Sequence, residues 1–253
     1  MANYSKQILQ NIADSKFNNQ NLINKALAND SENELIDLTE SLISQGFIDD
    51  AKSILENLNE KDNKNDQINL DLAEIYLDEG NDDQALDYLD KIEQKSSLYL
   101  SAQIDKADLY ESEGLTESAE GVLLDLQNIS SDPIVRFALA EFYDAEGENG
   151  KSAQLYDYLI NQGHELINKI NLHARLAMAL ASNGEFEESI TEFQKVGLKN
   201  LSSKEISSLA QAYFQSGDRE KSQQLIEENI DHQEASLDDY LNLASIYEKQ
   251  GNS

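Results

Sequence analysis

The feature that most constrains this chain is a repeat with a period close to 34 residues. Seven glycines recur at separations of 34, 34, 33, 37, 33 and 34 residues: Gly46, Gly80, Gly114, Gly147, Gly184, Gly217 and Gly251. A fixed period of this length is typical of proteins built from stacked copies of one supersecondary motif. The sequence therefore predicts an elongated stack of similar units, although its length of 253 residues would also suit one or two globular domains.

Other positions keep the same register as the glycines. Seven residues before each glycine is a small residue: Thr39, Ala73, Ala107, Ala140, Ala177, Ala210 and Ala244. Five residues after the first six glycines is another: Ala51, Ala85, Ala119, Ser152, Ser189 and Ser222. Four residues further on is a bulky one: Leu55, Leu89, Leu123, Tyr156, Phe193 and Ile226. The small residues allow two helices to lie close together, and the bulky residue fills the space between neighbouring pairs.

The local signals favour pairs of helices over strands. Leu35, Leu38 and Leu42 are three and four residues apart, the spacing of one helical face. Each glycine permits the left-handed turn that ends a first helix. Ser31 with Glu34 and Ser202 with Glu205 form capping-box patterns, and the Asp132–Pro133 pair is typical of a helix start. No segment alternates like a strand, so we expect an all-α fold.

This pattern resembles the tetratricopeptide repeat, a 34-residue helix–turn–helix unit with a Leu/small/Tyr/Gly/Ala/Phe signature at these offsets. The resemblance implies a right-handed α-solenoid superhelix. Residues 1–31 would form a degenerate N-terminal helical cap, residues 32–236 six repeats, and residues 237–253 the first helix of a seventh. The sequence departs from the family in lacking its Trp and closing Pro, and in carrying Lys106 where Leu is usual.

Two irregularities add further expectations. The 37-residue interval between Gly147 and Gly184 predicts an extra helical turn or a longer loop near residues 161–169. The last helix keeps an apolar face that includes Leu241 and Ile246. We therefore expect a chain that is the front piece of a longer repeat protein, with the alternative that this helix ends the stack.

Composition excludes several classes of function. The chain has 49 acidic and 19 basic residues, a net charge of −30, so we expect no nucleic-acid or anionic-membrane partner. It has no Cys, which removes thiolate catalysis and Cys-ligated metal sites and is compatible with a reducing compartment. No apolar signal segment is visible. These features predict a cytoplasmic protein.

Three motifs could suggest chemistry, but each lacks an essential part. Residues 145–152 match a relaxed phosphate-loop pattern, yet a predicted helix precedes them where a phosphate loop needs a strand. The Asp/Asn-rich segments 62–66 and 78–83 lack the ligand spacing of a calcium loop. No nucleophile with an adjacent base is visible. We expect no enzyme, no metal site and no cofactor.

In the family that the chain resembles, the first helices of the repeats line a concave groove that holds ligands. Of 24 groove positions in the first four repeats, ten are acidic and none is basic. The predicted partner-binding residues are Asp37, Glu40, Leu70, Asp71, Glu74, Asp78, Ile104, Asp105, Asp108, Glu111, Phe137, Glu141, Asp144, Arg175, Met178 and Phe214. A Lys/Arg-rich protein or peptide segment would suit such a groove. The alternative, a solvated acidic face with no ligand, stays open.

The leading functional prediction is a non-enzymatic scaffold or adaptor for protein–protein interaction. Clamping of an acidic C-terminal peptide, which some family members perform with Lys, Arg and Asn, is disfavoured because those sites are mostly Asp and Glu here. One rival is a peptide-sensing regulator, as found among bacterial repeat proteins, with its effector domain outside this chain. Another is a structural protein that self-associates through its exposed C-terminal helix.

Overall fold

A computed structural model describes residues 3–16, 19–231 and 237–251. The chain divides into two compact units, Met1–Val122 and Leu123–Ser253, which we call the N-terminal and C-terminal units. The boundary falls inside α8 (Thr116–Ile129). The repeat boundary predicted at residue 236 and the outermost residues of the predicted end segments lie outside the described residues.

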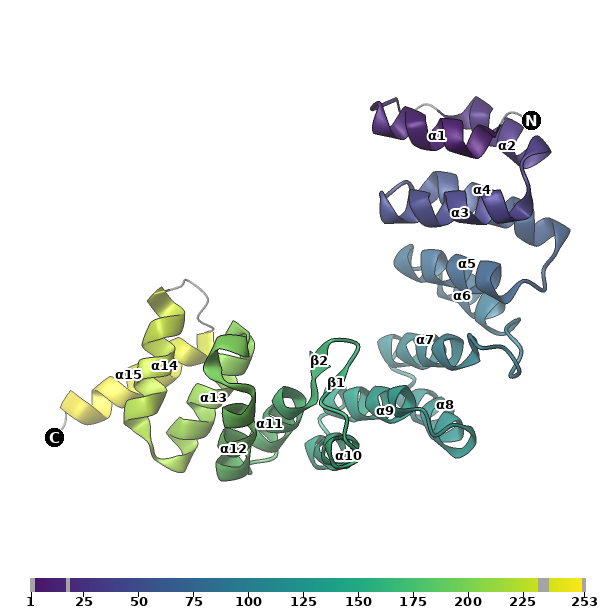
Figure 1. The fold of residues 1–253 in the computed structure, drawn as a ribbon. Helices are drawn as coiled ribbons and strands as arrows, with labels where there is room; N and C mark the ends of the chain where they lie inside the picture. Colours follow the sequence, from purple (N-terminus) through teal and green to yellow (C-terminus); the bar gives the residue numbers. More distant parts are fainter. Residues whose placement is uncertain (1–2, 17–18, 232–236, 252–253) are drawn as a thin grey trace. The chain divides into compact units, whose positions relative to one another are not determined.

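The N-terminal unit is entirely helical where it is described. Its helices before α8 are α1 (Tyr4–Ala13), α2 (Gln20–Asn29), α3 (Glu32–Ser44), α4 (Ile48–Lys61), α5 (Asp66–Asp78), α6 (Asp82–Leu89) and α7 (Tyr99–Ser112). Each odd-numbered helix up to α5 packs against the helix that follows it, and α4 also packs against α5. Figure 1 shows the resulting layers of helix pairs within this unit.

The C-terminal unit continues the same pattern after the end of α8. It contains α9 (Pro133–Ala145), α10 (Asn149–Asn161), β1 (Leu166–Ile167), β2 (Ile170–Asn171), α11 (Leu172–Ser182), α12 (Phe186–Val196), the 3-10 helix η1 (Leu198–Asn200), α13 (Ser203–Ser216), α14 (Arg219–Asp231) and α15 (Leu237–Gly251). The pairs α9–α10, α11–α12 and α13–α14 each pack together, and α15 packs on α13 and α14. The fold is an all-α solenoid of helix pairs.

The repeated positions form the core, as the sequence predicts. The small residues before the first six glycines and the small residues after them are all at most 1% exposed. The six bulky residues one turn further on are likewise at most 1% exposed. Ser189 shows how close the helices lie, because its Oγ donates a 2.7 Å hydrogen bond to the backbone oxygen of Ala177 in the paired helix.

The predicted helix ends are confirmed. The six turn glycines from Gly46 to Gly217 have φ between 69° and 94°. This left-handed conformation is unfavourable for residues that have a Cβ atom. Ser31 and Ser202 both form complete capping boxes with the Glu three residues later. Asp132 accepts a hydrogen bond from the backbone N–H of Ile134, with Pro133 at the first helical position.

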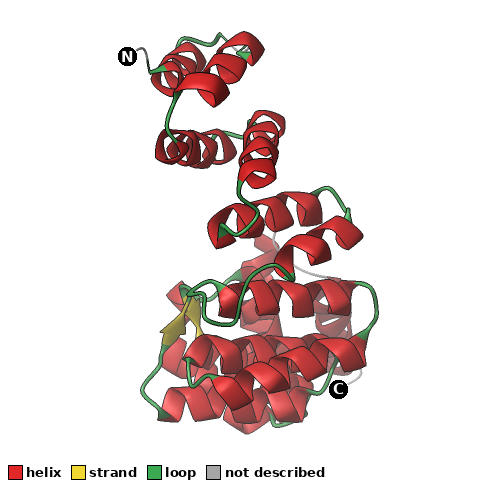
Figure 2. Ribbon diagram, turned by 90° about the vertical axis from the view of Figure 1, so that its right-hand side faces the viewer, coloured by secondary structure: helices red, strands yellow, loops and turns green. Residues whose placement is uncertain are grey.

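The long interval between Gly147 and Gly184 contains a small β-hairpin, drawn in yellow in Figure 2. Leu166 pairs with Asn171 and Ile167 with Ile170 in antiparallel register. Asn168 and Lys169 have φ of 48° and 68°, the positive values that a type I′ turn requires at both central residues. The prediction of a longer connection is confirmed, and the two-residue strands inside it are too short to show alternation in the sequence.

No helix among the described residues has both the length and the apolar composition needed to cross a membrane.

Candidate functional site

In the N-terminal unit, five of the predicted carboxylates lie on successive first helices. Glu40 is on α3, Asp71 and Glu74 are on α5, and Asp105 and Asp108 are on α7. We call these five residues the acidic ladder. Asp71 and Glu74, and likewise Asp105 and Asp108, are three residues apart, so each pair lies on one face of its helix.

The residues of the acidic ladder act on one another electrostatically. Burial raises the pKa of Asp71, and the charge of Glu40 raises it further, although a 2.7 Å hydrogen bond from Gln67 opposes the change. Burial also raises the pKa of Glu74, with contributions from Asp71 and Asp78. The ladder carboxylates are therefore close enough across α3 and α5 to disfavour one another's ionisation.

Asp105 has the most perturbed environment in the ladder. Burial, followed by the charges of Glu74 and Asp108, raises its pKa from 3.8 to about 6. Its Oδ2 atom is buried, and no described residue donates a hydrogen bond to it. A buried carboxylate oxygen without a donor is uncommon in folded proteins, because desolvation is then uncompensated. An incoming Lys or Arg side chain would supply both the donor and the opposite charge.

The other predicted residues of this unit differ in exposure. Asp37 and Asp78 are exposed, whereas Ile104 and Glu111 are half-buried. Leu70 is 6% exposed and packs in a cluster with Leu89, so it supports α5 and offers little contact area to a partner.

The C-terminal unit pairs its predicted carboxylates with basic groups. Arg175 Nη2 lies 3.1 Å from Glu141 Oε2, and the hydroxyl of Tyr156 donates a hydrogen bond to the other oxygen of Glu141. Burial raises the pKa of Asp144, but Arg175 and Lys204 both lower it. This part of the predicted groove is therefore electrostatically compensated, unlike the acidic ladder.

The apolar residues predicted for the C-terminal unit are largely packed. Phe137 is 6% exposed and its ring centre lies 6.3 Å from that of Tyr156. Met178 packs against the cluster that contains Leu209 and Tyr213, and Phe214 is half-buried.

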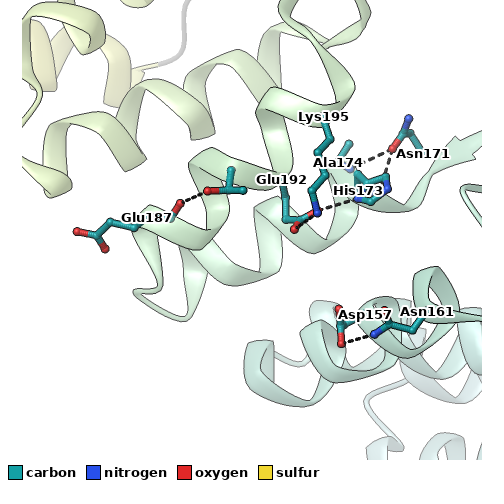
Figure 3. Close-up of polar contacts among 9 residues, drawn as sticks. Asp157, Asn161, Asn171, His173, Ala174, Glu187, Glu192 and Lys195 are labelled. Carbon is teal, nitrogen blue, oxygen red and sulfur yellow. Dashed lines mark hydrogen bonds and ion pairs between the residues drawn. The ribbon is translucent and has the colours of Figure 1, made fainter.

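A polar link, shown in Figure 3, joins the first and second helices of one repeat. His173 Nδ1 on α11 lies 2.7 Å from Glu192 Oε2 on α12, and Lys195 Nζ lies 2.6 Å from Glu192 Oε1. Asn171 caps α11 by accepting hydrogen bonds from the backbone N–H groups of His173 and Ala174. His173 thus occupies a structural position at the edge of the core.

Sequence reasoning missed the pairing of Glu141 with Arg175 and Tyr156. These residues lie on three different helices, so their contact depends on how neighbouring repeats pack. The only signal in the sequence is that the basic Arg175 occurs in the repeat that follows the acidic ones.

Comparison with known families matches two parts of the chain. Residues 42–98 match a tetratricopeptide repeat family, and residues 112–164 match the tetratricopeptide repeats of YpiA-like proteins. A curated relative, the TPR repeat-containing protein YpiA of Bacillus subtilis, is 35% identical over 82 residues. The match covers 32% of this chain and 19% of that protein.

Solved structures with the same fold have low sequence identity. A tetratricopeptide repeat protein from Parabacteroides merdae has a TM-score of 0.60 and 14% identity, covering 97% of this chain and 99% of its own. PilW, a type IV pilus biogenesis factor, has a TM-score of 0.67 and 14% identity, covering 87% and 99%. YrrB, described as having an unusual peptide-binding site, has a TM-score of 0.56 and 13% identity, covering 77% and 97%.

Proposed function

Because this chain is a tetratricopeptide repeat protein, a class that generally mediates protein–protein interaction without catalysis, we propose that it is an adaptor that binds a Lys/Arg-rich protein segment at the acidic ladder. The observation that carries the proposal is the buried Oδ2 of Asp105, which has no hydrogen-bond donor among the described residues and lies close to Glu74 and Asp108. A guanidinium or ammonium group would relieve this repulsion when it binds.

The exposure of the ladder fits this role. Glu40, Glu74 and Asp108 are exposed, while Asp71 and Asp105 are half-buried. Exposed carboxylates would steer a basic segment toward the surface, and the two half-buried ones would anchor it after contact. A peptide-binding site in the structural neighbour YrrB is in keeping with a peptide as the ligand, although that likeness extends to the fold alone.

The experiment measures the affinity of a fluorescein-labelled peptide of alternating lysine and leucine for the wild-type chain and for a fourfold variant, Asp71→Asn, Glu74→Gln, Asp105→Asn and Asp108→Asn. We expect binding to weaken about tenfold or more, equivalent to ~1.4 kcal/mol. The matched control neutralises four exposed residues of the same unit: Glu60, Asp62, Glu113 and Glu117.

The two variants change the net charge equally, so only the position of the charges differs. Equal weakening by both variants, or an affinity that does not change with salt, would contradict the proposal. The second result would do so because attraction between exposed charges is screened over about 8 Å at 0.15 M salt.

A second candidate function is self-association through α15. Four large apolar side chains of this helix are 49–75% exposed: Leu237, Tyr240, Leu241 and Tyr247. Burial of such a face by a second copy would remove apolar surface from water. Sedimentation velocity over a range of concentrations tests this, with Leu241→Gln expected to lower the fraction of dimer. A monomer at every concentration would exclude it.

A further inference from the structure

The C-terminal unit contains a pocket whose charge is opposite to that of the acidic ladder. It has a volume of about 520 Å³ and is lined by residues of α8, α9 and α10. Arg136, Lys151, Tyr143, Tyr158 and Leu155 are among them. The pocket therefore brings two basic and two aromatic residues together in a chain with only 19 basic residues.

Both cations of this pocket are held over tyrosine rings. The guanidinium carbon of Arg136 lies 5.0 Å from the ring centre of Tyr158, and Lys151 Nζ lies 4.5 Å from that of Tyr143. Such cation–π contacts hold a cation over the ring, while N–H groups that point beyond the edge of the ring can still donate hydrogen bonds. Lys151 also lies 3.9 Å from Glu148, whereas no carboxylate of the described residues forms an ion pair with Arg136.

The pocket lies on a different face of α9 from the predicted groove. Arg136 and Tyr143 are seven residues apart, close to two helical turns, and share one face of α9. Glu141 and Asp144 project from another face, toward Arg175. Neither of these two carboxylates lines the pocket, and the acidic ladder belongs to the N-terminal unit.

The basic character of the pocket is not imposed by the fold. An equivalent pocket of about 380 Å³ lies between α10, α11 and α12, one repeat further along. Leu180 occupies the place of Tyr143 there, four residues before the turn glycine, and Glu188 occupies the place of Lys151, four residues after it. Repeats with the same geometry thus differ in charge, so the cations of the first pocket are a property of its sequence.

We propose that the pocket lined by Arg136 and Lys151 binds an acidic protein segment, with a carboxylate at the two cations and a neighbouring apolar side chain against Tyr158 and Leu155. Tyr158 is 43% exposed, which leaves ring surface available to such a side chain. The two cations match one or two carboxylates. A long polyanion such as a nucleic acid would be repelled by the net charge of −30.

The test measures fluorescence anisotropy with the full chain at 0.15 M salt. The probe is a labelled ten-residue peptide of alternating glutamate and leucine, compared with its glutamine–leucine counterpart and with an oligothymidylate of ten nucleotides. We expect the glutamate peptide to bind most tightly. Arg136→Gln should weaken that binding about tenfold, because it removes the charge-assisted hydrogen bonds that the guanidinium would donate to the carboxylate.

Two further variants distinguish specific binding in this pocket from nonspecific electrostatic attraction to the chain. Lys199→Gln removes the same charge from an exposed position in the same unit, and it should leave binding within twofold. Arg136→Lys keeps the charge but loses the fork of N–H donors, so it should weaken binding less than Arg136→Gln does.

Equal weakening by Arg136→Gln and Lys199→Gln would overturn the proposal, as would tighter binding of the oligothymidylate or of the glutamine peptide. Arg136→Gln should leave binding of the lysine–leucine peptide unchanged, because that probe addresses the acidic ladder. The two proposals can therefore fail independently of each other.

Discussion

Asp105 is the residue whose ionisation should most affect stability. Its pKa in the folded chain is raised from 3.8 to about 6, so the folded state binds a proton more readily than the unfolded state does. The free energy of unfolding should therefore fall as the pH rises from about 4 to about 6. We expect Asp105→Asn to raise it at pH 7 by about 1–2 kcal/mol, after allowing for solvent screening of a half-buried group.

Urea unfolding of the wild type and the variant at pH 4 and pH 7 measures this effect. The difference between the two proteins should be much smaller at pH 4, where Asp105 of the wild type is protonated in the folded state and about half ionised in the unfolded state. Glu60→Gln, at an exposed position of the same unit, serves as the control and should change stability by less than about 0.5 kcal/mol at either pH. A variant less stable than the wild type at pH 7 would show that Asp105 is paired in solution.

Single residues were predictable where their role is set by the repeat. Ala73, Ala107 and Ala140 are buried because every repeat requires a small residue at that position. The hydrogen bond from Tyr156 to Glu141 was not predictable in this way, since it depends on the distance between side chains of different helices. The proximity of Glu40 to Asp71 also depends on the distance between side chains of different helices. The charge of Glu40 raises the pKa of Asp71, but no local sequence pattern indicates this effect.

At the scale of helices, a buried amide pair joins α4 to α5, the second helix of one repeat to the first helix of the next. Asn59 Nδ2 donates a 2.7 Å hydrogen bond to Asn69 Oδ1, and the two residues are 8% and 0% exposed. Asn59→Leu would leave the buried oxygen of Asn69 without this donor. We expect a loss of about 1–3 kcal/mol in the free energy of unfolding.

Thermal or urea unfolding measures this loss, with Asn33→Ala as the matched control. Asn33 lies at an exposed position of α3, and its replacement should change stability by less than about 0.5 kcal/mol. A similar effect of the two substitutions would mean that the buried pair adds nothing specific to the packing of neighbouring repeats.

The β-hairpin provides a test of backbone strain at the same scale. Lys169 has a φ of 68°, and a side chain with a Cβ is disfavoured in this left-handed region. Lys169→Gly would create an Asn-Gly pair, the preferred sequence of a type I′ turn. We expect it to stabilise the C-terminal unit by about 0.5–1 kcal/mol, measured by thermal unfolding.

Lys169→Ala separates relief of strain from removal of the lysine side chain. Alanine keeps the Cβ, so this variant should not gain the stability of the glycine variant. Equal stabilisation by both substitutions would attribute the effect to the lost lysine. The hairpin also shows a limit of periodicity: the insertion was visible as a 37-residue interval, but its strands are two residues long and leave no alternating pattern.

At the scale of the whole chain, charge is distributed unevenly along the sequence. Residues 32–132 contain 27 acidic and 6 basic residues, and so hold −21 of the total charge of −30. In the C-terminal unit, by contrast, Arg175 compensates Glu141 and lowers the pKa of Asp144. The repeat register predicted both this gradient and the helices that carry it, whereas the pairing of individual charges required the structure.

This gradient predicts that salt stabilises the two parts of the chain to different extents. Repulsion among like charges opposes the compact state, and 0.15 M salt screens exposed charges over about 8 Å. Hydrogen exchange measured by mass spectrometry, between low salt and 0.15 M, should show protection rising more in α3, α5 and α7 than in α11 and α13. The fourfold ladder variant should lose most of this dependence, whereas the variant neutralised at Glu60, Asp62, Glu113 and Glu117 should retain more of it. An equal response of the two sets of helices would mean that the carboxylates of the acidic ladder repel one another too weakly to affect folding, which would also remove the main electrostatic reason for a basic partner to bind there.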